Sequence, residues 1–231
     1  MGTMKSSKFS LLPILVGVLL VIGIVVYFAV ADEQTYRDPY FGLTTEVPTN
    51  LDAERQAKYE AEVIDLTMQI ETREAAGEYV LDVYFNRAAD YQRLGKLRLA
   101  FEDFEKVVAG DSTNETAWNN MGDIRIDMGD IDGAEQYYKN SIREYPTEMS
   151  YTKLYKYYLE YRMDDRQNAL EPLLLEAIKT VGPTPLLYVK LGRFYIEAGD
   201  RDKAVAAYRQ AAVLDPDNEA IKEELREALA M

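Results

Sequence analysis

The fold is decided by residues 115–148, ETAWNNMGDIRIDMGDIDGAEQYYKNSIREYPTE, which align without a gap with residues 185–218, PLLYVKLGRFYIEAGDRDKAVAAYRQAAVLDPDN. The repeat period of about 34 residues is typical of a helix-turn-helix unit. Residues 81–114 follow the same register, although Ser112 replaces the proline that ends the other two units. The sequence therefore predicts an all-α stack of helix pairs.

Small residues recur where the two helices of a unit must approach closely. A bulkier side chain at such a position would push the helix backbones apart. We therefore expect these residues to be buried between helices: Gly122, Ala134 and Ser141 in one unit, and Gly192, Ala204 and Ala211 in the other.

The turn inside each unit is also readable from the sequence. Gly129 and Gly199 precede Asp130 and Asp200. Glycine adopts the left-handed conformation that ends a helix, and aspartate caps the free N–H groups of the next one. The prolines of the two units, Pro146 and Pro216, cannot continue a helix interior and so end each unit.

These residues resemble the tetratricopeptide repeat family, whose pattern is W-x2-L-G-x2-Y, A-x3-F and P. Arg125 departs from the pattern, because the family has an aromatic residue there. The resemblance covers residues 81–218 and implies a right-handed helical solenoid of about four pairs, with the first helix of each pair lining a groove. The matching residues are Trp118, Met121, Gly122, Ala134, Tyr138 and Pro146, and then Tyr188, Leu191, Gly192, Tyr195, Ala204, Tyr208 and Pro216.

The segments around the clear repeats are less regular. Residues 149–184 fit the pattern only loosely, and Pro172 predicts a kink that interrupts the second helix of this unit. Residues 51–80 predict a long helix and its connection. Residues 219–231 predict a charged capping helix.

The N-terminal region predicts a membrane anchor. Residues 11–30 carry no charge over a length that can cross a bilayer. The lysines before this stretch place residues 1–10 in the cytoplasm and the body on the other side of the membrane. Residues 31–50 are rich in proline and polar residues and suit a linker. The alternative is a cleaved signal peptide that leaves a secreted soluble protein.

Composition excludes several classes of function. The chain has 40 acidic and 26 basic residues, for a net charge of −14, so we expect no nucleic-acid partner. It contains no histidine and no cysteine, which removes the commonest general base, thiolate nucleophile and transition-metal ligands. We therefore expect no catalytic residue, metal, cofactor or small-molecule substrate, and no enzymatic activity.

The expected function is a membrane-tethered scaffold that binds a protein or peptide client, in a role such as secretion or envelope assembly. A periplasmic holdase-type chaperone for exported chains is the alternative. Mapping the groove implied by the resemblance onto this chain gives the candidate partner-binding residues Phe85, Ala89, Gln92, Arg93, Asn119, Asp123, Ile126, Asp127, Val189, Arg193, Ile196 and Glu197.

Tyrosines crowd the first helix of the irregular unit, at positions 151, 155, 157, 158 and 161. Tyrosine suits peptide interfaces, because its ring can be buried while its hydroxyl stays in water. One hypothesis adds Tyr157 and Tyr161 to the partner-binding residues. The other is that Tyr151, Tyr155 and Tyr158 fill the core and leave Tyr157 and Tyr161 merely exposed.

Overall fold

The computed structural model describes residues 39–162 and 166–231. Residues 43–231 form one compact unit, and residues 39–42 form a turn that belongs to the N-terminal unit. The predicted membrane-spanning helix at 11–30 lies outside the described residues. Among the helices that are described, none combines the length and the apolar character needed to cross a bilayer.

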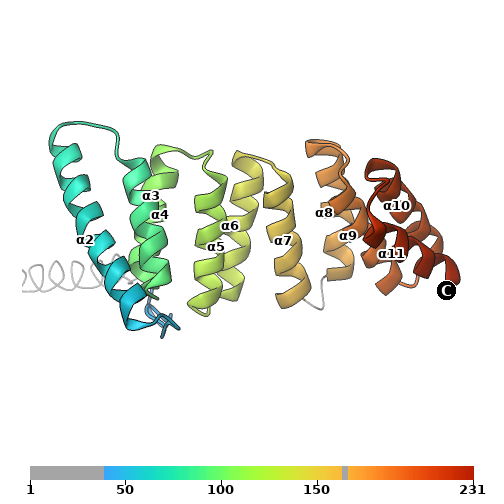
Figure 1. The fold of residues 1–231 in the computed structure, drawn as a ribbon, viewed down its shortest axis with the longest axis horizontal. Coiled ribbons are helices and arrows are strands. Elements are labelled where there is room, and N and C mark those ends of the chain that lie inside the picture. The colour runs from blue at the N-terminus through green and yellow to red at the C-terminus, as the bar shows by residue number, and fades with distance from the viewer. Residues whose placement is uncertain (1–38, 163–165) are drawn as a thin grey trace, which may run out of the picture. The chain divides into compact units, whose positions relative to one another are not determined.

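In the described residues the chain forms ten helices and is all-α. Consecutive helices pack against each other in chain order, as in a solenoid (Figure 1). The helices are α2 (Ala53–Ala75), the pairs α3 (Leu81–Arg93) and α4 (Leu97–Gly110), α5 (Glu115–Asp127) and α6 (Ile131–Glu144), α7 (Glu148–Tyr161) and α8 (Arg166–Val181), α9 (Pro185–Glu197) and α10 (Arg201–Leu214), and finally α11 (Glu219–Ala230).

The turns within the two clear repeats have the predicted conformation. Gly129 and Gly199 adopt φ values of 88° and 75°, in the left-handed region. The side chains of Asp130 and Asp200 each accept a hydrogen bond from the backbone N–H three residues further on, at 2.9 and 3.2 Å. Each aspartate therefore caps the second helix of its unit, as the sequence indicated.

The small residues lie at close helix contacts, which confirms the prediction. A Cβ atom added to Gly122 would stand 2.6 Å from the ring of Tyr138, and one added to Gly192 would stand 2.7 Å from the ring of Tyr208. Both rings are almost fully buried. The small residues of the second helices have no exposed surface at all: Ala134, Ser141, Ala204 and Ala211.

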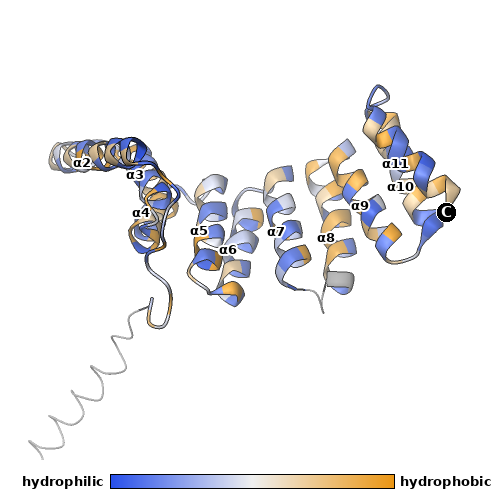
Figure 2. Ribbon diagram, turned by 60° about the horizontal axis from the view of Figure 1, so that its bottom comes forward, coloured by the Kyte–Doolittle hydropathy of each residue, from blue (hydrophilic) through white to orange (hydrophobic). Residues whose placement is uncertain are grey.

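Hydrophobic and hydrophilic residues are interspersed along the helices (Figure 2). One cluster of buried hydrophobic residues runs without a break from α6 to α11. A repeat cannot bury its apolar face alone, so each pair completes its core against the next.

Helix α8 continues through Pro172, which lies inside it. The sequence had indicated that this proline would interrupt the helix. Its ring is exposed. The backbone hydrogen bond that proline cannot make therefore lies on the solvent side, where water can take its place.

The C-terminal part of the predicted linker, residues 43–50, is held against the helical body. Residues 44–50 belong to no helix or strand. The N–H of Thr44 donates to the carbonyl of Met128 at 2.9 Å, and the N–H of Val47 donates to the carbonyl of Gly95, also at 2.9 Å. Met128 and Gly95 lie in the turns of the first two helix pairs, so this segment connects those turns. The sequence indicates only a linker at residues 31–50, because a segment that bonds to turns needs no periodic pattern of apolar residues.

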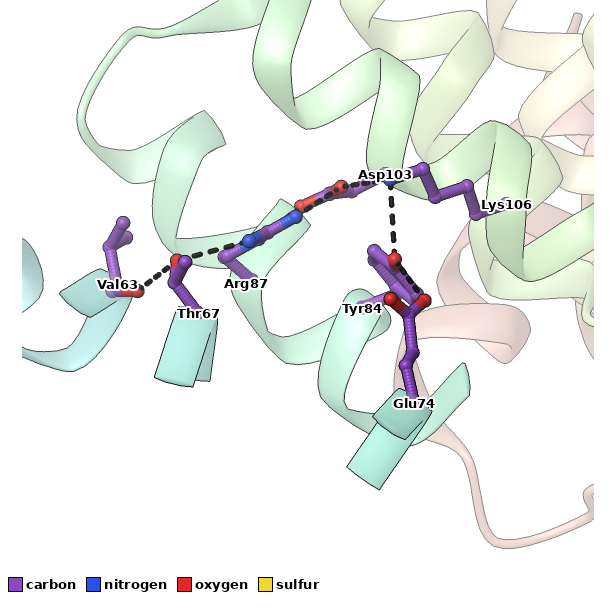
Figure 3. Close-up of polar contacts among 7 residues, drawn as sticks. All are labelled: Val63, Thr67, Glu74, Tyr84, Arg87, Asp103 and Lys106. Atoms are coloured by element: carbon purple, nitrogen blue, oxygen red, sulfur yellow. Dashed lines mark hydrogen bonds and ion pairs between the residues drawn. The ribbon is translucent and has the colours of Figure 1, made fainter. Parts of the chain in front are cut away.

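A polar network attaches α2 to the first helix pair (Figure 3). The guanidinium of Arg87 on α3 makes two hydrogen bonds to the carboxylate of Asp103 on α4, at 2.7 and 2.8 Å, and a third to Thr67 on α2 at 3.0 Å. Tyr84 on α3 donates to Glu74 on α2 at 2.6 Å. Burial, with the Glu74 hydrogen bond as the next cause, raises the pKa of Tyr84 to about 12, so this hydroxyl stays a donor at neutral pH.

Candidate functional site

The candidate site is a pocket of about 220 Å³ between α5 and α7. These two helices are the first members of neighbouring pairs, which the repeat resemblance expects to line the groove. The pocket brings together five of the candidate binding residues predicted from the sequence. Its lining residues are Asp123, Ile126 and Asp127 from α5, Tyr138 from α6, and Lys153, Lys156, Tyr157, Glu160 and Tyr161 from α7.

Asp123 is occupied by contacts within the protein. It accepts a hydrogen bond from the Tyr138 hydroxyl at 2.7 Å and one from the Lys153 ammonium at 2.5 Å. Burial, followed by the bond to Asp123, raises the pKa of Tyr138, so the phenol remains protonated. The Asp123 carboxylate therefore helps to fix the pocket wall.

Asp127 lies one turn further along α5 and differs from Asp123. In the described part of the chain it makes neither a hydrogen bond nor an ion pair. Partial burial raises the pKa of Asp127, and the nearby charge of Asp123 raises it further. Its charge is therefore stabilised less than it would be in water, and a cation from outside would stabilise it.

The two tyrosines of the pocket have different environments. Tyr157 is only 1% exposed, and its hydroxyl donates to the carbonyl of Ile131 at 3.0 Å. Tyr161 is 40% exposed, with its ring centroid 5.9 Å from that of Tyr157. Tyr157 is therefore part of the interior. The hypothesis that it is merely exposed is wrong, and its buried ring leaves little surface for a client, so of the two tyrosines only Tyr161 is available for contact. Because α7 packs against α6 and α8 at once, it has more than one buried face.

Three charged residues and one aromatic residue of this pocket were not identified as site residues from the sequence. Lys156 and Glu160 form an exposed ion pair at 3.8 Å, and Lys153 bonds to Asp123. The spacing of residues 153, 156, 157, 160 and 161 along α7 is helical, and this spacing could have identified them once Tyr157 was chosen. Tyr138 was interpreted only as a repeat residue of the core.

The candidate residues of the first unit lie elsewhere. Phe85 lines a separate pocket of about 300 Å³ and contacts the ring of Phe104 edge-on, at 5.5 Å between centroids. Ala89 and Gln92 are half-buried. Arg93 is 2.6 Å from Asp90 and lies over the ring of Tyr59 on α2.

The candidates of the last unit lie on α9, which contributes no residue to the lining of the pocket. Val189 is only 9% exposed, which leaves little of its side chain for a partner. Arg193 pairs with Glu224 of α11 through two hydrogen bonds, one of them 3.1 Å long. Ile196 is half-buried and Glu197 is exposed.

Asn119 is the remaining candidate, and it lies one turn before Asp123 on the same face of α5. It is only 3% exposed, so it belongs to the interior rather than to a contact surface. Within the described residues its Oδ1 atom accepts no hydrogen bond. Residues 39–162 and 166–231 contain no group of three or more metal-ligating side chains placed to hold an ion.

Comparison with known proteins gives two family matches. Models of the tetratricopeptide repeat match residues 115–148 and residues 185–218. These are the same two segments that align with each other in the sequence.

One curated relative is the DnaJ homolog subfamily C member 3 of Gallus gallus, which is 30% identical over 149 residues. The match covers 58% of this chain and 29% of the relative, so this chain spans less than a third of that protein's length.

Two solved structures share the fold at low sequence identity. MamA is 18% identical with a TM-score of 0.52, and the match covers 72% of this chain and 96% of MamA. The C-terminal part of a repeat-containing protein from Cytophaga hutchinsonii is also 18% identical with a TM-score of 0.52, and the match covers 76% of each chain.

Proposed function

Because this chain contains tetratricopeptide repeats, at residues 115–148 and 185–218, we propose that its helical body is a scaffold that binds a protein or peptide client. Repeats of this kind form extended binding surfaces from successive first helices. The observation that carries the proposal is the pocket between α5 and α7, where candidate binding residues from two such helices meet. The proposed function is binding alone, without a catalysed reaction.

The test uses a photo-crosslinker placed at the pocket. Tyr161→p-benzoylphenylalanine keeps an aromatic ring at a position that is 40% exposed. Irradiation of native membranes that carry the full chain is expected to attach a specific client, which mass spectrometry identifies. The matched control is Val213→p-benzoylphenylalanine on α10, where the side chain is 74% exposed but lies outside the pocket.

The control decides how the crosslinks are interpreted. Products that appear at Tyr161 and not at Val213 support the proposal. Identical products at both positions, or none at either, contradict it. Crosslinks to many unrelated unfolded proteins would instead favour a holdase-type chaperone.

We also propose that residues 11–30 anchor the scaffold in a membrane, with residues 1–10 in the cytoplasm and the helical body on the other side. The uncharged stretch is long enough to cross a bilayer, and Lys5 and Lys8 precede it. An anchored body of this kind would gather clients at the outer face of the membrane, as secretion or envelope assembly requires.

Protease added to spheroplasts of an expressing bacterium is expected to digest the helical body and leave a short protected N-terminal fragment. The expectation follows from the excess of lysine on the N-terminal side of the stretch. A body that resists protease until the membrane is opened would reverse the proposed topology. If the intact mass of the purified protein corresponds to a chain that begins near residue 32, the stretch is instead a cleaved signal peptide.

A further inference from the structure

We propose that the pocket between α5 and α7 binds a positively charged side chain, lysine or arginine, of the client. This inference rests on the proposed function and adds the chemistry that the site selects. It depends on the size of the pocket, on its charges and on its exposed aromatic ring.

The size of the pocket fits one side chain. Sites for drug-sized ligands have volumes of about 300–1,000 Å³. This pocket, at about 220 Å³, is smaller. A single extended residue of a peptide can therefore fill it, while the rest of the peptide lies along the helices.

The charges of the pocket favour a cation. Its lining has three carboxylates, those of Asp123, Asp127 and Glu160, and two ammonium groups. Lys153 pairs with Asp123 at 2.5 Å, and Lys156 lies 3.8 Å from Glu160. Asp127 is left without an ion pair in the part of the chain that the structure describes. The negative charge of Asp127 would repel an anion, whereas a cation would form an ion pair with it.

The exposed ring of Tyr161 provides a second contact for a cation. Lysine and arginine are attracted to the face of an aromatic ring within about 6 Å. The chain already contains such contacts, because Lys106 lies 4.3 Å from the ring centroid of Tyr84 and Lys190 lies 4.6 Å from that of Tyr155.

The Asp127 carboxylate has no ion-pair partner among the described residues, so its charge makes folding less favourable, and an experiment can use this effect. Burial, together with repulsion by Asp123, raises the pKa of Asp127, so at neutral pH its ionised form is less stable in the folded chain than in the unfolded one. Asp127→Asn removes that unfavourable charge. The variant is therefore expected to unfold at the same temperature as the unchanged chain or above it, and yet to bind the client less tightly.

The experiment compares two peptides that differ in one charge. The full chain, in detergent micelles, is immobilised, and surface plasmon resonance follows the binding of a nine-residue peptide of glycine and serine with one central arginine. The second peptide carries citrulline, a neutral side chain of the same shape. We expect the arginine peptide to bind about five- to tenfold more tightly, because a charge-assisted pair is lost in the other.

Three variants complete the test. Asp127→Asn is expected to remove the preference for arginine. Tyr161→Ser is expected to weaken binding of the arginine peptide about two- to fivefold. The matched control is Asp217→Asn, at an exposed carboxylate outside the pocket, which is expected to keep the full preference. Thermal unfolding of each variant shows that the fold is intact.

Two outcomes separate the inference from the proposed function. Equal binding of the arginine and citrulline peptides, or an unchanged preference in Asp127→Asn, overturns the inference; if the crosslinker at Tyr161 still captures a specific client, the scaffold function stands. If the crosslinker captures no client, the proposed function fails, whichever peptide binds.

Discussion

Replacing Asp103 with alanine is expected to lower the free energy of unfolding by about 3–5 kcal/mol, because removing one partner of a buried ion pair leaves the other charge without compensation. The side chains of Asp103 and Arg87 are only 4% and 12% exposed, and the two residues share two hydrogen bonds. Arg87 also bonds to Thr67, so the loss is expected to loosen α2 as well. Urea unfolding followed by circular dichroism measures the cost, and hydrogen exchange in α2 measures the loosening.

Two further variants, one outside this network and one within it, test whether burial of the ion pair is the cause. Glu102→Ala on the same helix breaks a pair whose side chains are 48% and 38% exposed, and it should cost no more than about 0.5 kcal/mol. The double variant Arg87→Met with Asp103→Leu should recover most of the loss, because apolar residues of similar volume often replace a buried pair at little cost. A double variant as unstable as Asp103→Ala would contradict this explanation.

Gly122→Ala and Gly192→Ala are each expected to cost about 1–3 kcal/mol, since extra carbon in a tightly packed helix contact forces its neighbours apart. The added methyl group would stand under 3 Å from the ring of Tyr138 or Tyr208. Neither ring can move away easily, because each is at most 3% exposed. Thermal unfolding of the full chain measures both variants, and the similar geometry predicts similar costs.

Gly110→Ala is the matched control for these two variants. Its added carbon would lie 2.5 Å from a terminal methyl group of Leu81. This flexible side chain can turn aside more cheaply than a buried tyrosine ring, so the change should cost less than about 1 kcal/mol. If all three variants had the same effect, close packing against the tyrosine rings would not be the reason for glycine in the repeat.

The site was predictable from the sequence only in part. Repeat mapping found Asp123, Ile126 and Asp127, because a residue's place in the repeat fixes which helix face it occupies. It also placed Arg93 and Arg193 in the groove, where α2 and α11 supply contacts to their side chains. Those end helices lie outside the repeat pattern, so the pattern could not predict what they contact.

The sequence by itself determined the helix pairs, their turns and their closest contacts. Gly129, Asp130 and Gly122 act through local backbone geometry and side-chain size, and such effects depend on residue type and spacing alone. The tertiary structure decided that Tyr157 is buried while Tyr161 is exposed, and that residues 43–50 bind to turns. It also decided that Asp127 has no hydrogen-bond or ion-pair partner among the described residues. These features depend on how helices distant in the sequence pack against each other, and residue spacing within one helix carries no information about that packing.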